Sequence, residues 1–360
     1  MLVSTPVPRT WDLFCRVIDN LGDAGVCWRL CADLAERGET VRLWIDDASA
    51  LAWMAPLGAP RVTVHDWHTH GASSEASAPG DVVIEAFGCE LPAAFITRMA
   101  ARTQPPLWVN LEYLSAETYV ERNHRLRSPQ SHGPGAGLTK WFFYPGFTDR
   151  TGGLTRERGL MHRRAAFDAA HWLGGMGIAA HPGERVVSLF CYAQAAVPAL
   201  LERLALQPTL LLCAAGAATE QVTCLLGPTL RRGSLRAVAL PWLTQVEYDH
   251  ALWASDLNFV RGEDSFVRAQ WAGAPFVWQA YPQDGGAQHQ KIEAFLARHV
   301  QAMPAELAGS VTAMWAAWNR NSVTLPAVWP DAQAWAHECR AWRASLLAQA
   351  DLASQLIGLA

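Results

Sequence analysis

Short apolar runs alternate with helix-like segments along the first half of the chain, and this alternation constrains the fold more than any other feature. Apolar runs of a few residues are typical of buried strands, whereas helices repeat apolar residues every three or four positions. The alternation predicts a parallel sheet with helices on both faces. The strand-like runs are Trp11–Ile18, Val41–Ile45, Arg61–Val64, Asp81–Phe87 and Leu107–Asn110, and the helix-like segments are Val26–Arg37 and Phe95–Arg102.

The same alternation returns in the second half. Its strand-like runs are Val186–Tyr192, Thr209–Ala214, Ala237–Leu240, Leu257–Val260 and Phe276–Gln279, and its helix-like segments are Ala195–Leu206, Asp264–Gly273 and Gln288–Arg298. From about Ser128 to Gly183 the alternation breaks. The segment begins with SPQSHGPGAGLTK, which is rich in Gly, Pro and Ser, and this predicts loops and a crossing between domains. We predict an α/β protein with two Rossmann-like domains. Their expected limits are 1–150 and 184–328, with a linker at 151–183 and a helical tail at 329–360 that packs back on the first domain.

Composition limits the classes of function. The formal net charge of the chain is -4, whereas nucleic-acid binders normally present a basic face, so direct nucleic-acid binding is not expected. No signal peptide and no apolar run of ~18 residues are found, which predicts a cytoplasmic protein that does not enter membranes. The eight cysteines include no C-x-x-C pair and are expected to be buried free thiols.

The turn after the first predicted strand carries two carboxylates. Its sequence, DNLGDAG, stands where dinucleotide-binding proteins carry G-x-G-x-x-G. Acidic side chains at these positions would repel a pyrophosphate, while the glycines still permit a tight turn. Because ligands of such sheets bind at the carboxyl ends of strands, Asp19 and Asp23 are candidate catalytic groups, with Asn20 and Gly22 beside them. The alternative is that Asp23 only caps the following helix.

A second polar turn, Arg261-Gly262-Glu263-Asp264-Ser265, joins a predicted strand to a predicted helix. Helix N-termini attract phosphate groups, and an arginine can bind them bidentately. We expect Asp264 or Ser265 to cap the helix, which leaves Glu263 for another role. The alternative is an ordinary capped helix with an arginine in solvent.

Aromatic and amide side chains stand at or after the ends of other predicted strands of the second half. Phe190 and Tyr192 could stack on a nucleobase, and Gln245 could read a base edge beside Tyr248. Tyr281 is expected to line the rim of the same site. Packing in the core is the alternative for each aromatic residue.

The motif HDWHTH resembles a metal-binding sequence, because it contains three histidines, His65, His68 and His70. The polar sequence that follows, GASSEASAPG, favours an exposed loop, so we expect no metal site.

These stretches together resemble the bacterial protein-arginine rhamnosyltransferases that modify elongation factor P. The resemblance covers nearly the whole chain and rests on WDLFCRVIDNLGDAGVCWRL, SLFCYAQAAVPALL and DLNFVRGEDSFVRAQWAGAPFVWQAYPQ. It implies a GT-B glycosyltransferase with an acceptor-binding first lobe and a donor-binding second lobe that face a central cleft. It further implies inverting transfer of rhamnose from dTDP-β-L-rhamnose to an arginine of elongation factor P, without metal or cofactor, in support of polyproline translation.

The resemblance also implies roles for single residues. Asp23 matches the general base, Asp19 a companion carboxylate, and Glu263 an active-site glutamate. Donor-binding positions and those that frame the thymine fall on Tyr192, Gln245, Arg261, Asp264, Ser265, Phe190 and Tyr248. The turn departs mildly from its relatives at Leu21 and Ala24, which often are aromatic and Ile there, but both aspartates remain.

Three alternatives stay open at this stage. A glycosyltransferase of the same fold could act on a lipid-linked or carbohydrate acceptor. A nucleotide-binding protein without catalysis would leave the pair Asp19 and Asp23 unexplained. A dehydrogenase is disfavoured because the glycine fingerprint is absent.

Overall fold

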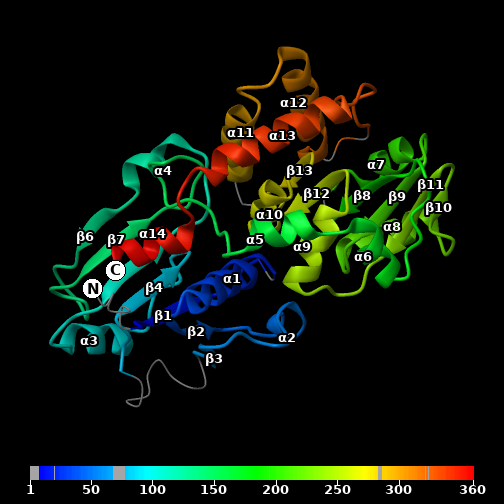
Figure 1. Ribbon diagram of the computed structural model, residues 1–360. Helices are drawn as coiled ribbons and strands as arrows, with labels where there is room; N and C mark the ends of the chain where they lie inside the picture. Colours follow the sequence, from blue (N-terminus) through cyan, green and yellow to red (C-terminus); the bar gives the residue numbers. More distant parts are fainter. Residues whose placement is uncertain are drawn as a thin grey trace, which may run out of the picture. The chain divides into compact units, whose positions relative to one another are not determined.

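The computed structural model describes residues 8–19, 21–67, 78–193, 195–282, 286–320, 322 and 324–360. The chain divides into two compact units (Figure 1). The first unit comprises Met1–Arg158 and Gln349–Ala360, and the second comprises Gly159–Ala348. No helix of the described ranges is long and apolar enough to cross a membrane.

A seven-stranded sheet forms the centre of the first unit, with strands in the order β3-β2-β1-β4-β5-β7-β6. Every neighbouring pair is parallel except β6 and β7. One face of the sheet packs on α1 and α14, and the other packs on α3. The strands are β1 (Thr10–Cys15), β2 (Thr40–Ile45), β3 (Val62–Asp66), β4 (Val82–Ala86), β5 (Leu107–Leu111), β6 (Leu126–Pro129) and β7 (Thr139–Phe143), and the helices are α1 (Gly22–Glu36), α2 (Leu51–Met54), α3 (Ala93–Ala101), α4 (Thr118–Asn123) and α14 (Leu352–Leu359).

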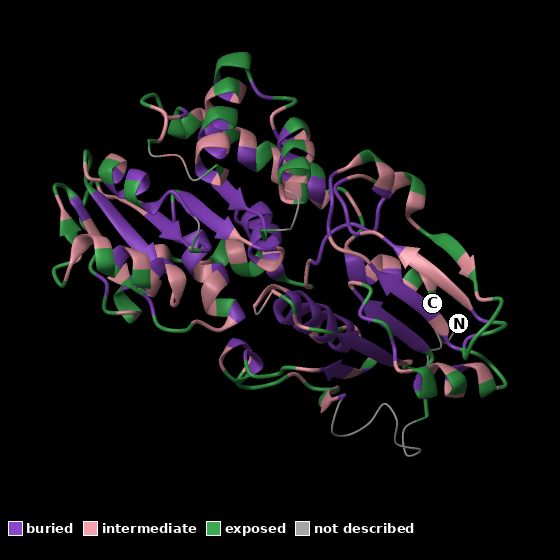
Figure 2. Ribbon diagram, turned by 180° about the vertical axis from the view of Figure 1, so that it is seen from behind, coloured by how far each residue is buried: buried purple, intermediate pink, exposed green. Residues whose placement is uncertain are grey.

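A six-stranded sheet in the order β10-β11-β9-β8-β12-β13 forms the centre of the second unit. Only the short β10 is antiparallel among its described neighbours. Central strands of both sheets are buried, as expected where helices cover both faces (Figure 2). The strands are β8 (Arg185–Leu189), β9 (Thr209–Cys213), β10 (Arg231–Arg232), β11 (Leu235–Ala239), β12 (Leu257–Arg261) and β13 (Phe276–Gln279). The helices are α5 (Leu160–Ala166), α6 (Ala169–Gly175), α7 (Val197–Leu204), α8 (Ala217–Leu226), α9 (Gln245–Trp253), α10 (Asp264–Ala272), α11 (Ala287–His299), α12 (Ala305–Asn319) and α13 (Ala332–Leu347).

The predicted α/β class is confirmed, but the segment from Ser128 to Gly183 is more regular than its composition suggested. It contains β7 and the helices α5 and α6. Four of the five residues of β7 are only half-buried. This strand and the short β6 and β10 lack the continuous apolar run by which most of the other strands were recognised. The helical tail is also interrupted, because α13 ends at Leu347 and α14 begins only at Leu352, where Asp351 is the N-cap and accepts the Ser354 N–H. All eight cysteines are free, and seven of them are buried.

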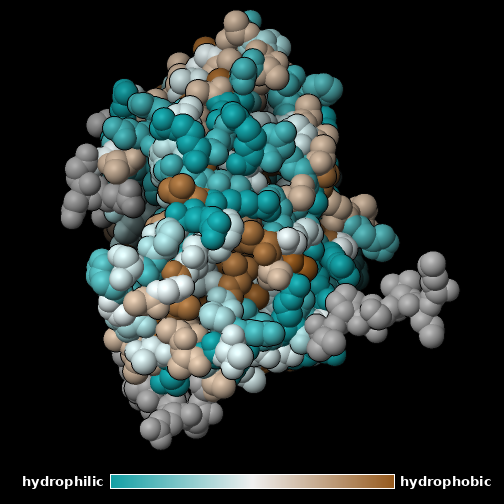
Figure 3. All heavy atoms as spheres, turned by 90° about the vertical axis from the view of Figure 1, so that its left-hand side faces the viewer, coloured by the Kyte–Doolittle hydropathy of each residue, from teal (hydrophilic) through white to brown (hydrophobic). Residues whose placement is uncertain are grey.

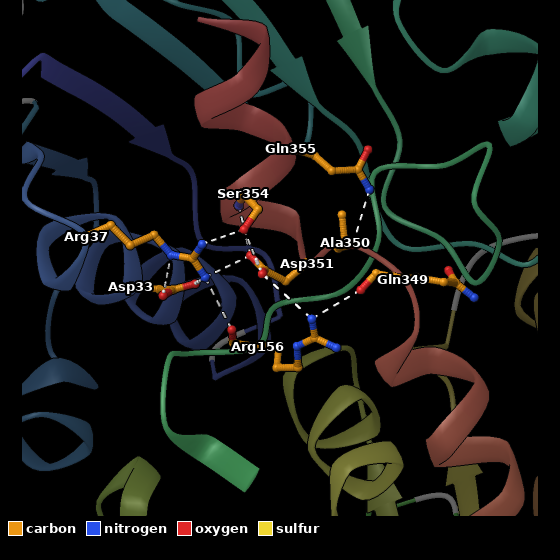
Figure 4. A network of polar contacts seen from close by, with 8 residues as sticks. All are labelled: Asp33, Arg37, Arg156, Gln349, Ala350, Asp351, Ser354 and Gln355. Atoms are coloured by element: carbon orange, nitrogen blue, oxygen red, sulfur yellow. Dashed lines mark hydrogen bonds and ion pairs between the residues drawn. The ribbon is translucent and has the colours of Figure 1, made fainter. Parts of the chain in front are cut away.

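The C-terminal helix α14 packs on α1, as expected from the sequence. Leu352, Ala353 and Leu356 join the apolar cluster beneath α1. At the edge of this contact, Arg37, the C-cap of α1, donates hydrogen bonds to both carboxylate oxygens of Asp33 at 2.9 and 3.0 Å and to Asp351 at 2.8 Å (Figure 4).

The segment that leads into α14 is hydrogen-bonded to the segment before Gly159 within the same unit. The Leu352 N–H donates to the Leu154 carbonyl at 2.9 Å, and Arg156 donates to the Gln349 carbonyl at 3.1 Å. Gln355 donates to the Thr151 carbonyl at 2.9 Å. The two segments through which the chain leaves and re-enters the first unit are therefore held together by hydrogen bonds.

We expect the substitution Arg37→Met to destabilise the first unit, because it leaves the buried carboxylate of Asp33 and the half-buried carboxylate of Asp351 without their shared cation. Loss of one partner from a buried ion pair costs about 3–5 kcal/mol. Urea unfolding, followed by hydrogen exchange of α1 and α14, measures this loss. Arg150→Met is the control, because Arg150 pairs with Glu121 through a side chain that is 73% exposed, and it should change stability by less than ~1 kcal/mol. Equal stability of the two variants would contradict the expectation.

Candidate functional site

The carboxyl ends of β1, β4 and β5 lie next to one another in the first sheet, because these three strands are adjacent and parallel. The loop that carries Asp19 follows β1, Phe87 follows β4, and Tyr113 lies two residues past β5. This edge is where open α/β sheets bind ligands.

A hollow of about 400 Å³ lies at the opposite edge, where β5 and β7 begin. Leu107, Leu138, Trp141 and Leu359 line it, together with Asp81. Figure 3 faces the left-hand side of Figure 1 and shows apolar residues gathered on that face within a hydrophilic surround. Because it lies at the amino ends of the strands, this hollow is distinct from the edge that carries Asp19 and Asp23.

Asp23 lies in the first turn of α1 and is 3% exposed. Its Oδ2 accepts the backbone N–H groups of Ile18 at 2.8 Å and Asp19 at 3.0 Å. The alternative reading, that Asp23 only caps α1, is therefore wrong, since the hydrogen bonds of its side chain go to the loop before the helix. The N-cap of α1 is Leu21, which makes no side-chain cap.

The second carboxylate, Asp19, is half-buried in the same loop. Its carbonyl accepts the N–H groups of Gly22 at 2.9 Å and Asp23 at 3.3 Å. A Cβ at position 22 would lie 2.5 Å from Asp19 Oδ2, so only glycine allows the carboxylate this position. The structure thus brings Asp19, Gly22 and Asp23 together, whereas Asn20 lies outside the described residues.

Opposing effects act on the pKa of Asp23. Burial raises it above the ordinary 3.8, while the hydrogen bonds from Ile18, Asp19 and the Tyr113 side chain lower it. The neighbouring charge of Asp19 raises it further. The net shift is upward, which makes Asp23 a stronger base than a carboxylate in water.

In the second unit, the guanidinium of Arg261 lies between two aromatic rings. Its Cζ is 4.4 Å from the ring centre of Phe190 and 4.3 Å from that of Tyr192. Phe190 also contacts Tyr248 with ring centres 5.6 Å apart, and Tyr192 contacts Tyr281 at 5.5 Å. Five of the candidate side chains thus form one cluster at the carboxyl ends of β8, β12 and β13.

The turn after β12 is closed by Ser265. Its Oγ accepts the Arg261 N–H at 3.0 Å and donates to the Arg261 carbonyl. The expected cap at Asp264 or Ser265 is wrong, because α10 begins at Asp264 and Glu263 is its N-cap, without a side-chain hydrogen bond. Gly262 takes a positive φ of 64°, which a glycine adopts without strain.

Gln245 begins α9 and is 8% exposed. A buried pair that sequence reasoning missed joins this helix to α10. Arg268 donates to the two carboxylate oxygens of Asp249 at 2.8 and 2.6 Å. The pair fixes the helix of Gln245 and Tyr248 against the helix of Asp264 and Ser265.

Two glutamines, also missed from the sequence, hold the backbone of Tyr192. Gln279 Oε1 accepts the Tyr192 N–H at 2.9 Å, and Gln221 donates to the Tyr192 carbonyl at 3.3 Å. Gln279 ends a predicted strand, so its position was a usable signal, whereas Gln221 lies within α8 and carried none.

No group of three or more His, Cys, Asp or Glu side chains suited to a metal ion occurs among the residues that the structure describes. His65 lies at the end of β3 and stacks on Trp44 with ring centres 4.6 Å apart. His68 and His70 lie outside the described residues.

Comparisons with known proteins identify the family of the chain. Residues 11–360 match the family described as "Elongation-Factor P (EF-P) rhamnosyltransferase EarP". A protein-arginine rhamnosyltransferase from Pseudomonas putida is 44% identical over 97% of both chains. One from Pseudomonas aeruginosa is 42% identical over 97% of this chain and 98% of its own.

Solved structures extend the likeness to the fold. A structure described as the basis for EarP-mediated arginine glycosylation of translation elongation factor EF-P is 30% identical, covers 98% of both chains and has a TM-score of 0.62. The spinosyn rhamnosyltransferase SpnG shares the fold at 11% identity, with a TM-score of 0.57 over 97% of this chain and 99% of its own. The GT-B fold class expected from the sequence is confirmed. The family match and the identity to its members show that the chain belongs to the EarP family of protein-arginine rhamnosyltransferases.

Proposed function

We propose that this protein transfers rhamnose from dTDP-β-L-rhamnose to an arginine of elongation factor P, with inversion and without a metal ion. Membership in the EarP family supports the acceptor and the sugar. The observation that carries the mechanism is the buried carboxylate of Asp23, whose pKa is raised at the carboxyl edge of the first sheet. Because the acceptor is a translation factor, we place the reaction in the cytoplasm.

An arginine is a poor nucleophile, because its guanidinium keeps its proton up to a pH of about 12 or above. Two carboxylates can bind the guanidinium and turn one nitrogen toward the donor. In the proposed step this nitrogen bonds to the anomeric carbon while the bond from that carbon to the diphosphate oxygen breaks. Asp23 accepts the proton that the nitrogen loses, and dTDP departs. A single displacement inverts the anomeric centre.

Asp19 and Asp23 divide this work in the proposal. Asp19 is half-buried and so accessible to an incoming side chain, whereas Asp23 is almost fully buried and its pKa is raised. A general base works best when its pKa approaches the working pH. We therefore assign proton transfer to Asp23 and binding of the guanidinium to Asp19.

The second unit supplies the donor site in this proposal. The rings of Phe190, Tyr192, Tyr248 and Tyr281 offer surfaces for the thymine, and Gln245 offers an amide for its edge. Arg261 and the N-terminus of α10, with Gly262, Asp264 and Ser265, receive the diphosphate, and Glu263 lies in the same turn.

The first test of the proposed transfer reaction is a measurement of the mass of elongation factor P. Purified protein, elongation factor P and dTDP-rhamnose should yield elongation factor P with one added deoxyhexose on an arginine. A carbohydrate or lipid-linked acceptor would leave elongation factor P unmodified and appear instead as donor turnover with that acceptor. Binding of dTDP without any transfer would indicate a nucleotide-binding protein and overturn the proposal.

We expect Asp23→Asn to reduce kcat by roughly 10²-fold or more, because the variant cannot accept a proton. Its affinity for dTDP, measured by calorimetry, should stay within about twofold of the wild type, since the proposed donor residues lie in the second unit. Full turnover by Asp23→Asn would remove Asp23 as the base.

The pH dependence of kcat/KM should show an acidic limb that belongs to Asp23. The base works only when ionised, so activity is present above its folded-state pKa and is lost as the pH falls through it. Because burial raises this pKa, the limb should lie above 3.8. In Asp19→Asn the remaining turnover should show the limb at lower pH, because a neighbouring negative charge is gone. If the acidic limb of Asp19→Asn lies at the same pH as that of the wild type, the limb reports the titration of a group other than Asp23.

Arg261→Lys should weaken dTDP binding about tenfold or more, because an ammonium cannot bind a diphosphate through two parallel hydrogen bonds. Calorimetry with dTDP measures the loss. Arg232→Lys serves as the control, because Arg232 pairs with Glu202, whose side chain is 70% exposed. Unchanged binding by Arg261→Lys would place the diphosphate elsewhere.

A further inference from the structure

Tyr113 contacts the proposed base, although neither its sequence position nor the proposed mechanism gives it a role. It lies two residues past the end of β5 and is half-buried. Its side chain makes a hydrogen bond to Asp23. The other two donors to that carboxylate, the N–H groups of Ile18 and Asp19, are backbone groups that both reach Oδ2.

The ring of Tyr113 stacks on the ring of Phe87, with centres 4.2 Å apart and planes 9° from parallel. Phe87 follows β4 directly, and Ala86 pairs with Leu111 at the ends of the two strands. The stack therefore joins two neighbouring strand ends beside the loop of Asp23.

The backbone of Phe87 is held in an unusual conformation. Its φ of 58° lies in the left-handed region, which costs a residue with a side chain about 1–2 kcal/mol. A hydrogen bond from the Phe87 N–H to the Leu111 carbonyl at 2.7 Å holds this conformation. Strained residues persist where the surroundings over-determine them, commonly at functional sites. Here the residue with the left-handed backbone is the one whose ring stacks on Tyr113.

We propose that Tyr113 is a positioning residue for the reaction, whose hydroxyl holds the ionised carboxylate of Asp23 in the orientation that receives the proton, with Phe87 fixing the Tyr113 ring. This inference rests on the proposed function, because it assigns Asp23 as the base. A donor on a side chain can orient the carboxylate independently of the loop that supplies the two backbone donors. It also favours the ionised form of Asp23 over the protonated one.

The titratable groups that interact with Asp23 come from its own loop, from the end of β5 and from α1. Asp19 lies in its own loop, Tyr113 comes from the end of β5, and the buried thiol of Cys27 lies one turn further along α1. Of the three, Tyr113 alone donates a side-chain hydrogen bond to it. A change confined to the Tyr113 hydroxyl therefore tests the inference without altering the other two groups.

Tyr113→Phe is the decisive variant, because it retains the stack on Phe87 and removes only the hydroxyl. Loss of a hydrogen bond to a charged group corresponds to roughly a tenfold to hundredfold decrease in kcat. KM for elongation factor P should stay within about twofold, because the variant leaves Asp19 in place. The acidic limb of kcat/KM should move to higher pH, because the ionised form of Asp23 has lost a donor.

Tyr119→Phe is the matched control. Tyr119 lies in the same unit, contacts Tyr144 edge to face at 5.9 Å, and makes its side-chain hydrogen bond to Ser115. Its kcat and acidic limb should equal those of the wild type. A second variant, Phe87→Leu, keeps the hydroxyl but removes its support, and it should lower kcat less than Tyr113→Phe does. If Tyr113→Phe retains the kcat and the limb of the wild type, the inference is overturned.

A measurement that needs no turnover separates this inference from the proposed function. Carbon-13 NMR of labelled aspartate carboxyls reports the titration of Asp23 directly, with Asp23→Asn identifying the signal. The pKa of Asp23 should rise in Tyr113→Phe and stay unchanged in Tyr119→Phe. If the wild-type protein transfers no sugar to elongation factor P, the proposed function is overturned. If the pKa of Asp23 is the same in the wild type and in Tyr113→Phe, this inference alone is overturned.

Discussion

The buried carboxylate of Asp23 is the group on which the proposed site of the first unit depends. A lone buried charge is unfavourable, and here three hydrogen-bond donors compensate for the lost water: the N–H groups of Ile18 and Asp19 and the side chain of Tyr113. These donors come from the loop after β1 and from the segment after β5. One carboxylate thus ties two strand ends to the first turn of α1 and fixes the loop that presents Asp19.

In the second unit, aromatic rings hold the charged group in place. The guanidinium of Arg261 is held at the end of β12 by Phe190 and Tyr192, and the Tyr192 backbone is held in turn by Gln221 and Gln279. In both units a charged group stands at the carboxyl edge of a parallel sheet and is oriented by neighbouring strand ends. Such preorganisation suits groups that must meet developing charge without first reorganising.

Features that depend on residues close together in the sequence could be predicted, whereas contacts between residues far apart in the sequence could not. Alternation of strand and helix and the polar turns after strands are local, so the α/β class and the clustering of Phe190, Tyr192 and Arg261 could be anticipated. The suggested capping was wrong at both turns, because Asp23 bonds to the loop before α1 and Ser265 bonds to the last residue of β12. The contacts of Tyr113 with Asp23 and Phe87 depend on the register of β1, β4 and β5, which no local pattern encodes.

The loop before α1 also gives a physical reason for two aspartates rather than one. Gly22 leaves room for the Asp19 carboxylate at 2.5 Å from where a Cβ would stand, so Asp19 stays close to Asp23 and raises its pKa. Under the proposed function, an arriving guanidinium adds a positive charge beside both groups and offsets this repulsion. The acceptor would then lower the pKa of the very carboxylate that must take its proton. Burial of Asp23 opposes that effect and keeps the base strong while the acceptor is bound.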